Sequence, residues 1–405
     1  MIQPLQWFER RLGGLLAWYL ALLVVVVTLA PFEVAWPSRP TLVGFVSLSD
    51  VIANVGFFLP LGFALEFSGR RRPALVALGM SLLVEMIQEF VPGRAPSLLD
   101  VATNTLGAWI GAELCRMVRA RLAARADRVG VLALDLPLVG LFYLLTPLLW
   151  LTGLSAGEEP VRRALAALVG VAGALILAAV DRHYLRPRGM AAWVAPVAGG
   201  CWYAVGLIPG WLDDPGYVVT GALVVGVTTW VCAIAAARGE RFGARYEAPT
   251  LRRIAMPLTV HMVVAACWPL QPRVALGFGL GQPVSQLGTS GILAALELIA
   301  ACTVVGYALA EIRGRVREPV KWSRTIVIGQ AISVAILLTG FRAFNARLGA
   351  SLVETALYAA AAGFGSLLYV RQREYVRAVL GRRTMVLSRR SYGRMGGPLP
   401  VDASP

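Results

Sequence analysis

Long, predominantly apolar stretches recur along the whole chain, and they restrict its fold more than any other feature. Each holds about 20 residues, enough to cross the hydrocarbon core of a bilayer as a helix. Backbone N–H and C=O groups find no water in that core, so such stretches form helices rather than open sheet. The chain is also 57% hydrophobic and only 15% charged, which is unlike a soluble domain. The sequence therefore predicts an all-α fold, a polytopic transmembrane helix bundle.

Twelve of these stretches are expected to be membrane spans. The first follows Arg10 and Arg11, as the apolar part of a signal peptide does, but its run exceeds the usual length of about 7–15 residues. It is therefore expected to be a retained helix. The expected spans are 12–31, 49–68, 74–91, 99–118, 130–152, 161–180, 190–208, 217–237, 254–270, 290–312, 325–341 and 352–370.

Basic residues are distributed unevenly between the two sides of the predicted bundle. All but seven of the 38 Lys and Arg residues fall on the side that holds both termini. Because short cytoplasmic loops are enriched in Lys and Arg, both termini are predicted to be cytoplasmic. The net charge of +15 is thus a topology signal, and no nucleic-acid partner is expected. The seven exceptions are Arg39, Arg94, Arg162, Arg163, Arg273, Arg342 and Arg347.

The twelve spans divide into three sections that share one layout of four spans, with polar outer stretches and basic inner turns. The predicted units are a first four-helix unit at 1–129, a second at 130–253 and a third, degenerate unit at 254–370. A basic cytoplasmic tail, 371–405, is expected to be largely disordered.

Individual residues also match between the first and third units. Ser97-x2-Asp100 parallels Ser351-x2-Glu354, and Gly111 parallels Gly365. Internal repeats are common in membrane proteins. Chance matching in so biased a composition is the alternative explanation.

Polar residues within the apolar stretches of the first 111 residues are the main functional signal. Ionisable groups are costly inside a membrane and tend to mark functional sites. They occur here as pairs three or four residues apart, and such pairs share one helix face. The predicted topology places them toward the outer ends of neighbouring spans, where they can meet in one cavity. The candidate site residues are Asp50, Asn54, Glu85, Gln88, Arg94, Asp100 and Asn104.

The residue types suggest different roles. The carboxylates Glu85, Asp50 and Asp100 are the candidate catalytic acids and bases. Arg94 is expected to bind phosphate and to pair with Glu85, because its guanidinium is a fixed, planar cation.

The three amides, Asn54, Gln88 and Asn104, are expected to bind substrate through hydrogen bonds. A divalent cation held by the carboxylates is a further option, so metal and cofactor requirements stay open. Structural explanations compete with these roles. Asp50 and Asp100 each open a span, where N-capping alone accounts for an aspartate.

The same polar residues resemble a known family, the VanZ-like proteins, over about residues 12–118. That family is named for a protein associated with resistance to the glycopeptide teicoplanin. The resemblance implies a role in the bacterial cell envelope and a place in the cytoplasmic (inner) membrane. The later eight spans depart from a protein with one such unit. The resemblance is carried by Asp50-Val-Ile-Ala-Asn54, Phe58-Leu59-Pro60-Leu61-Gly62-Phe63, Glu85-Met86-Ile87-Gln88, Pro92-Gly93-Arg94, Ser97, Asp100-Val101, Asn104 and Gly107.

Three hypotheses about function follow. The first is a site that binds or processes an anionic, polyprenyl-linked or glycolipid envelope intermediate drawn from the membrane lipids. The second is a transporter or lipid flippase, and the third is a non-catalytic assembly subunit of an envelope polysaccharide system. The sequence contains no GxSxG, HExxH or P-loop motif. Histidine catalysis is not expected, since His183 lies in a basic loop and His261 in the ninth span.

Overall fold

The computed structural model describes most of the 405-residue chain. The described residues are 5–36, 48–92, 94, 96–123, 126–156, 159–185, 189–208, 214–239, 247–268, 278–279, 288–316, 324–344 and 350–394.

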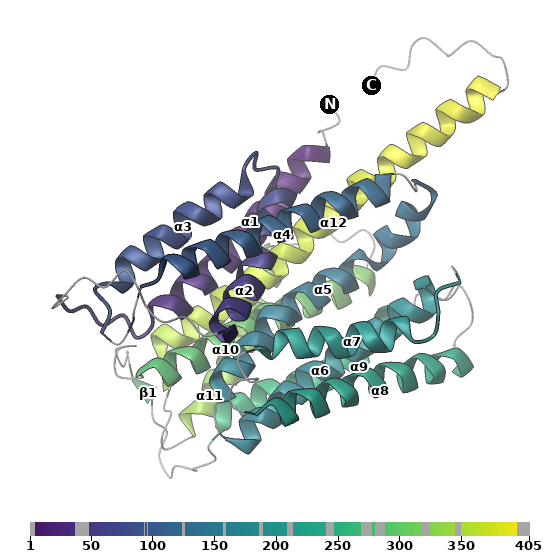
Figure 1. The fold of residues 1–405 in the computed structure, drawn as a ribbon. Helices are drawn as coiled ribbons and strands as arrows, with labels where there is room; N and C mark the ends of the chain where they lie inside the picture. The colour runs from purple at the N-terminus through teal and green to yellow at the C-terminus, as the bar shows by residue number, and fades with distance from the viewer. Residues whose placement is uncertain are drawn as a thin grey trace.

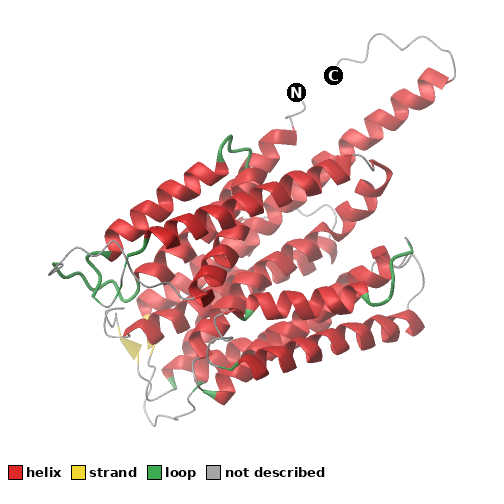
Figure 2. Cartoon of the chain, viewed as in Figure 1, coloured by secondary structure: helices red, strands yellow, loops and turns green. Residues whose placement is uncertain are grey.

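The described part of the chain is almost entirely helical, as Figures 1 and 2 show. Its helices match the twelve predicted spans in order. A π-helical turn, η1 (Asp181–Leu185), follows the sixth helix, and two short parallel strands, β1 (Phe278–Gly279) and β2 (Ala350–Ser351), pair near one end of the bundle. The helices are α1 (Leu5–Leu29), α2 (Leu48–Phe67), α3 (Pro73–Gln88), α4 (Leu98–Ala123), α5 (Ala126–Ala156), α6 (Pro160–Val180), α7 (Val194–Gly206), α8 (Pro215–Gly239), α9 (Glu247–Cys267), α10 (Gly288–Val316), α11 (Arg324–Ala343) and α12 (Leu352–Arg394).

Eight of these helices are long and apolar enough to cross a membrane by themselves, and α3 is a shorter apolar helix of 16 residues. The predicted fold class is therefore confirmed. The chain forms an all-α bundle of a multi-pass membrane protein.

Local chemistry explains where the helices of the first unit begin and end. The Ser68 hydroxyl donates to the Leu65 carbonyl after the last turn of α2. Gly69 then adopts a φ of 78°, a left-handed conformation that glycine accepts without strain. Pro73 opens α3 at its first position, where its missing N–H costs nothing.

Helix packing follows one order throughout the bundle. In α1–α4, α5–α8 and α9–α12 alike, the second helix of the set packs on the fourth, the third on the fourth and the first on the second. Figure 1 shows α1–α4 on one side of the bundle and α6–α9 on the other, with α5, α10 and α12 between them. The division into three related units stays a prediction, and this shared order is the packing that it would produce.

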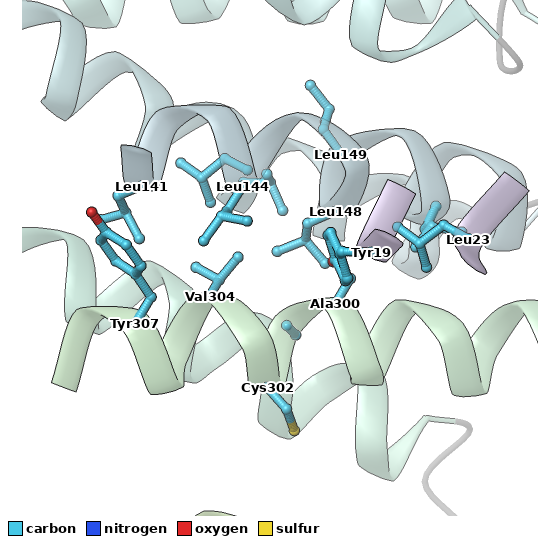
Figure 3. Packing of buried hydrophobic residues seen from close by; sticks show 14 of the residues in the cluster. Tyr19, Leu23, Leu141, Leu144, Leu148, Leu149, Ala300, Cys302, Val304 and Tyr307 are labelled. Carbon is cyan, nitrogen blue, oxygen red and sulfur yellow. The ribbon is translucent and has the colours of Figure 1, made fainter. Parts of the chain in front are cut away.

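The core lies where α1, α5 and α10 meet. Leu144 and Leu148 of α5 pack toward Ala300 and Val304 of α10, as Figure 3 shows, and all four are buried. Tyr19 of α1 belongs to the same buried cluster and lies beside Leu148 and Ala300. The core thus joins the first unit to the rest of the bundle.

The C-terminal helix differs from its predicted end at residue 370. α12 continues to Arg394, so residues 371–394 of the expected tail are helical in the structure. An ion pair between Arg371 and Glu374, three residues apart and 2.8 Å between nitrogen and oxygen, supports the extension. Residues 395–405 of the expected tail lie outside the described residues.

A polar cluster as the candidate functional site

All seven candidate residues lie at one end of the first four helices. Asp50 is in the first turn of α2 and Asp100 in the first turn of α4. Glu85 and Gln88 are in the last turn of α3, which runs the opposite way. The antiparallel order of α2, α3 and α4 therefore brings these termini together, with Asn54 and Asn104 one turn deeper.

Hydrogen bonds connect the three helices through these side chains. Asn54 Nδ2 donates to Asp100 Oδ1 at 2.8 Å and joins α2 to α4. Asn104 Nδ2 donates to Ser81 Oγ at 2.9 Å and joins α4 to α3. The predicted convergence of these side chains is thus present in the structure.

Glu85 has a defined role at the start of α4. The Ser97 backbone N–H donates to Glu85 Oε2 at 2.9 Å, and the Glu85 side chain is 9% exposed. A carboxylate is stabilised there, because the first N–H groups of a helix lack partners and carry partial positive charge.

Asp100 lies within electrostatic range of both other candidate carboxylates. Asp100 interacts with Asp50 and also with Glu85. The printed partners of Glu85 and Asp100 are uncharged, a backbone N–H and an amide. Like charges therefore gather at this end of α2, α3 and α4 without an ion pair to Glu85 or Asp100 among the described residues.

Arg94 and Gln88 contact α1 instead of the carboxylates. Arg94 Nη2 donates to the carbonyl oxygens of Val27 and Ala30 at 3.4 and 3.3 Å. Gln88 Nε2 donates to the Thr28 carbonyl at 2.9 Å. The last carbonyls of a helix have no internal partner and attract cations. The expected Glu85–Arg94 pair is therefore not formed in the described structure, although Arg94 stays exposed at the rim.

We expect Gln88→Leu to lower the free energy of unfolding by about 1 kcal/mol, because the Thr28 carbonyl loses its side-chain donor. Met86→Leu, on the exposed face of the same helix, is the matched control and should change it by less than about 0.5 kcal/mol. Thermal melting of the purified protein in mild detergent measures both. Equal melting temperatures for Gln88→Leu and the wild type would show that this hydrogen bond does not stabilise the fold.

The third four-helix set carries a different arrangement at the corresponding place. Ser351 and Glu354 open α12 as Ser97 and Asp100 open α4. Glu354 Oε1, however, is paired with Arg342 Nη2 of α11 at 3.2 Å, and Arg342 also donates to the Tyr358 hydroxyl. The third set thus neutralises its carboxylate internally, whereas Asp100 meets only the uncharged Asn54 and the electrostatic influence of other acids.

Analysis of the sequence missed some partners that the structure reveals. Ser81 accepts from Asn104 and lies four residues before Glu85, so helical spacing from Glu85 is the signal that would have found it. Thr103 is a second, longer contact of Asn54 at 3.4 Å.

A second buried polar cluster lies outside the first unit, among α5, α6, α9 and α10. Glu297, 1% exposed, is contacted by the Ser155 hydroxyl, by Arg162 Nη1 at 3.4 Å and by His261 Nε2 at 3.4 Å. His261 Nδ1 lies 3.3 Å from the Leu165 carbonyl, so His261 is a hydrogen-bonded core residue. No spacing in the sequence connects residues on four different helices.

A divalent cation held by the carboxylates stays an open prediction for this site. Among the described residues, no group of three or more His, Cys, Asp or Glu side chains is arranged to hold a metal ion.

Fold and site together define the class, a multi-pass membrane protein with a polar cluster at one end of its first four helices. Residues 16–119 match the model of the VanZ/LLP1 family. This match confirms the expected VanZ-like resemblance, and it spans all seven candidate residues, six of them on α2, α3 and α4 and Arg94 in the loop before α4. No curated protein and no solved structure matches the chain.

Proposed function

We propose that the polar end of the VanZ-like unit binds the headgroup of an anionic, lipid-linked envelope intermediate in the bacterial cytoplasmic membrane. The observation that carries the proposal is the clustering of Asp50, Glu85 and Asp100, with uncharged partners for Glu85 and Asp100. Carboxylates grouped in this way favour a ligand that brings hydroxyl or amine donors. A sugar or amino-sugar headgroup supplies both.

Arg94 supplies the complementary charge. Only its Nη2 donates to α1 carbonyls, so the other guanidinium nitrogens at the exposed rim are placed to meet a phosphate. These hydrogen bonds to the end of α1 fix the orientation of the Arg94 guanidinium. An intermediate with a phosphate beside a sugar would contact Arg94 and the carboxylates at once.

Binding without bond cleavage is the form of this function that we favour. Asn54, Asn104 and Glu85 are held by other side chains and backbone, which suits recognition by pre-organised groups. Catalysis would assign Glu85, Asp50 and Asp100 as acid and base. A link to glycopeptide resistance, including teicoplanin, follows if the intermediate is a cell-wall precursor.

A transporter or lipid flippase is the second candidate function. The buried cluster of Glu297, His261 and Arg162 supports it, because charged groups buried within membrane spans often mark transport pathways. Flux of a labelled lipid across sealed liposomes that contain the protein would establish this function.

A non-catalytic assembly subunit is the third. It is supported by the hydrogen bonds that Asn54, Gln88 and Asn104 make within the protein. In that case the polar cluster only holds helices together.

Native mass spectrometry of the full chain in mild detergent tests the proposal, with glucosamine linked to undecaprenyl phosphate as the probe, because this lipid carries both a phosphate and an amino sugar. Phosphatidylglycerol serves as a second anionic lipid for comparison. We expect Arg94→Gln and Asp50→Asn to reduce probe occupancy at least about tenfold, as the loss of one charge-assisted contact implies. Asp50 is exposed, so its replacement should leave the melting temperature unchanged.

Arg163→Gln is the matched control, since Arg163 lies on α6 far from α1–α4 in the sequence and pairs with Asp214. Its probe occupancy should equal that of the wild type. Equal occupancy in all four proteins, or equal retention of both lipids, would contradict a specific site. A fall in melting temperature in Asp50→Asn would instead favour the assembly function.

A further inference from the structure

A cavity of about 250 Å³ lies at the opposite end of the first unit from the polar cluster. It is bounded by α1, α2, α4, α5, α10 and α12, so it lies where the VanZ-like unit meets the remaining helices. Its walls are mainly apolar. They include Leu16, Phe63, Leu144 and Leu368.

The cavity opens between α4 and α5. Val118 of α4 and Val139 of α5 both line it, and they are 39% and 41% exposed. Surface residues on membrane-spanning helices face lipid rather than water. Val139 lies in a stretch of α5 that is apolar enough to span the membrane, so the opening faces lipid near the end that carries the basic turn Arg70–Arg72.

One guanidinium lies at the edge of this apolar space. Arg119 lines the cavity and donates through Nη2 to the Phe67 carbonyl at 2.9 Å and to Glu9 Oε2 at 3.3 Å. Its Nε is buried and has no hydrogen-bond partner among the described residues. Buried donors are nearly always satisfied, so this one calls for an acceptor from outside the chain.

We infer that this cavity holds one hydrocarbon chain of an anionic phospholipid, with the headgroup phosphate near Arg119. An apolar cavity of this size stays dry, because water finds too few polar partners in it. An empty one destabilises the fold in proportion to its volume. Lipid chains are the apolar molecules that surround the protein, and the guanidinium recognises phosphate.

This site is independent of the proposed function. It lies at the other ends of α2 and α4 and uses none of the seven candidate residues. Variants in one site should leave ligand binding in the other unchanged.

Native mass spectrometry of the full chain tests the inference with dioleoyl-phosphatidylglycerol and its neutral counterpart, dioleoyl-phosphatidylcholine, added singly to delipidated protein. We expect one retained phosphatidylglycerol in the wild type. Val118→Trp and Val139→Trp fill the opening and should reduce its occupancy at least about tenfold. Both positions are exposed, so these variants should fold, which a melting curve checks.

Val231→Trp is the matched control, because Val231 is 51% exposed on α8 and does not line the cavity. It should bind lipid as the wild type does. Arg119→Gln should remove the preference for phosphatidylglycerol over phosphatidylcholine. If both tryptophan variants retain phosphatidylglycerol as the wild type does, the cavity does not hold the lipid's hydrocarbon chain. If Arg119→Gln still prefers phosphatidylglycerol over phosphatidylcholine, Arg119 does not bind the headgroup phosphate.

Discussion

Replacing Arg162 by methionine is expected to destabilise the folded protein by about 3–5 kcal/mol, because it leaves a buried carboxylate without its cation. Glu297 is 1% exposed, and Arg162 Nη1 lies 3.4 Å from its Oε2. The remaining contacts of Glu297, from Ser155 and His261, bring no fixed charge. The midpoint of unfolding in detergent measures the change.

A double variant separates this cause from a general packing defect. Arg162→Met combined with Glu297→Met removes both charges, and replacing a buried ion pair by apolar side chains is often close to neutral. The double variant should therefore recover most of the stability that the single variant loses. If it is as unstable as Arg162→Met, the loss comes from packing rather than from charge.

The neighbouring arginine is the matched control. Arg163 pairs with Asp214 at 3.1 Å, but these side chains are 22% and 43% exposed. Exposed pairs contribute about 0–1 kcal/mol, so Arg163→Met should have a small effect. A loss below about 1 kcal/mol in Arg162→Met would contradict the view that Glu297 needs Arg162 as its counter-charge.

Gly111→Ala is expected to lower the free energy of unfolding by about 1–3 kcal/mol and to weaken ligand binding at the polar cluster. A Cβ at Gly111 would overlap the Leu59 carbonyl oxygen, and one at Gly62 would overlap that of Ala108. The backbones of α2 and α4 are thus in direct contact, and an added methyl group forces them apart. The same separation stretches the bond from Asn54 to Asp100, now 2.8 Å.

Two further glycines make this prediction specific. A Cβ at Gly79 of α3 would have nothing within 4 Å, so Gly79→Ala should be neutral or raise stability by up to about 1 kcal/mol. Gly365 of α12 approaches the Thr303 carbonyl of α10 as Gly111 approaches Leu59. Gly365→Ala should therefore lower the melting temperature and leave binding of the probe at the polar cluster unchanged.

The melting temperature and the probe binding of Gly111→Ala have to be compared. If Gly111→Ala melts like the wild type, α2 and α4 do not pack as closely as the structure indicates. If it melts lower but binds the probe normally, the polar cluster is not the binding site. Both measurements use the same purified protein.

The close packing of α2 on α4 has a counterpart in α10 and α12, which is what the predicted repeat between the first and third units would produce. Gly62 and Gly111 contact the carbonyls of Ala108 and Leu59, and Gly306 and Gly365 contact those of Ala362 and Thr303. The Gly111–Gly365 match was visible in the sequence, whereas the carbonyls opposite them were not. A glycine in an apolar stretch indicates close packing without naming its partner.

The sequence by itself determined that this protein is a helical membrane protein and where its helices lie, because the bilayer leaves an apolar stretch of about 20 residues few other conformations. It also identified the polar residues of the first unit, since ionisable groups stand out in so apolar a background. Tertiary structure alone decided their partners. Arg94 and Gln88 donate hydrogen bonds to carbonyls of α1 rather than to Glu85. Glu297 forms an ion pair with Arg162, which lies far from it in the sequence. Which side chains contact one another depends on how the helices pack and rotate against each other. Hydrophobicity along the chain specifies each helix but not the face that it presents to its neighbour.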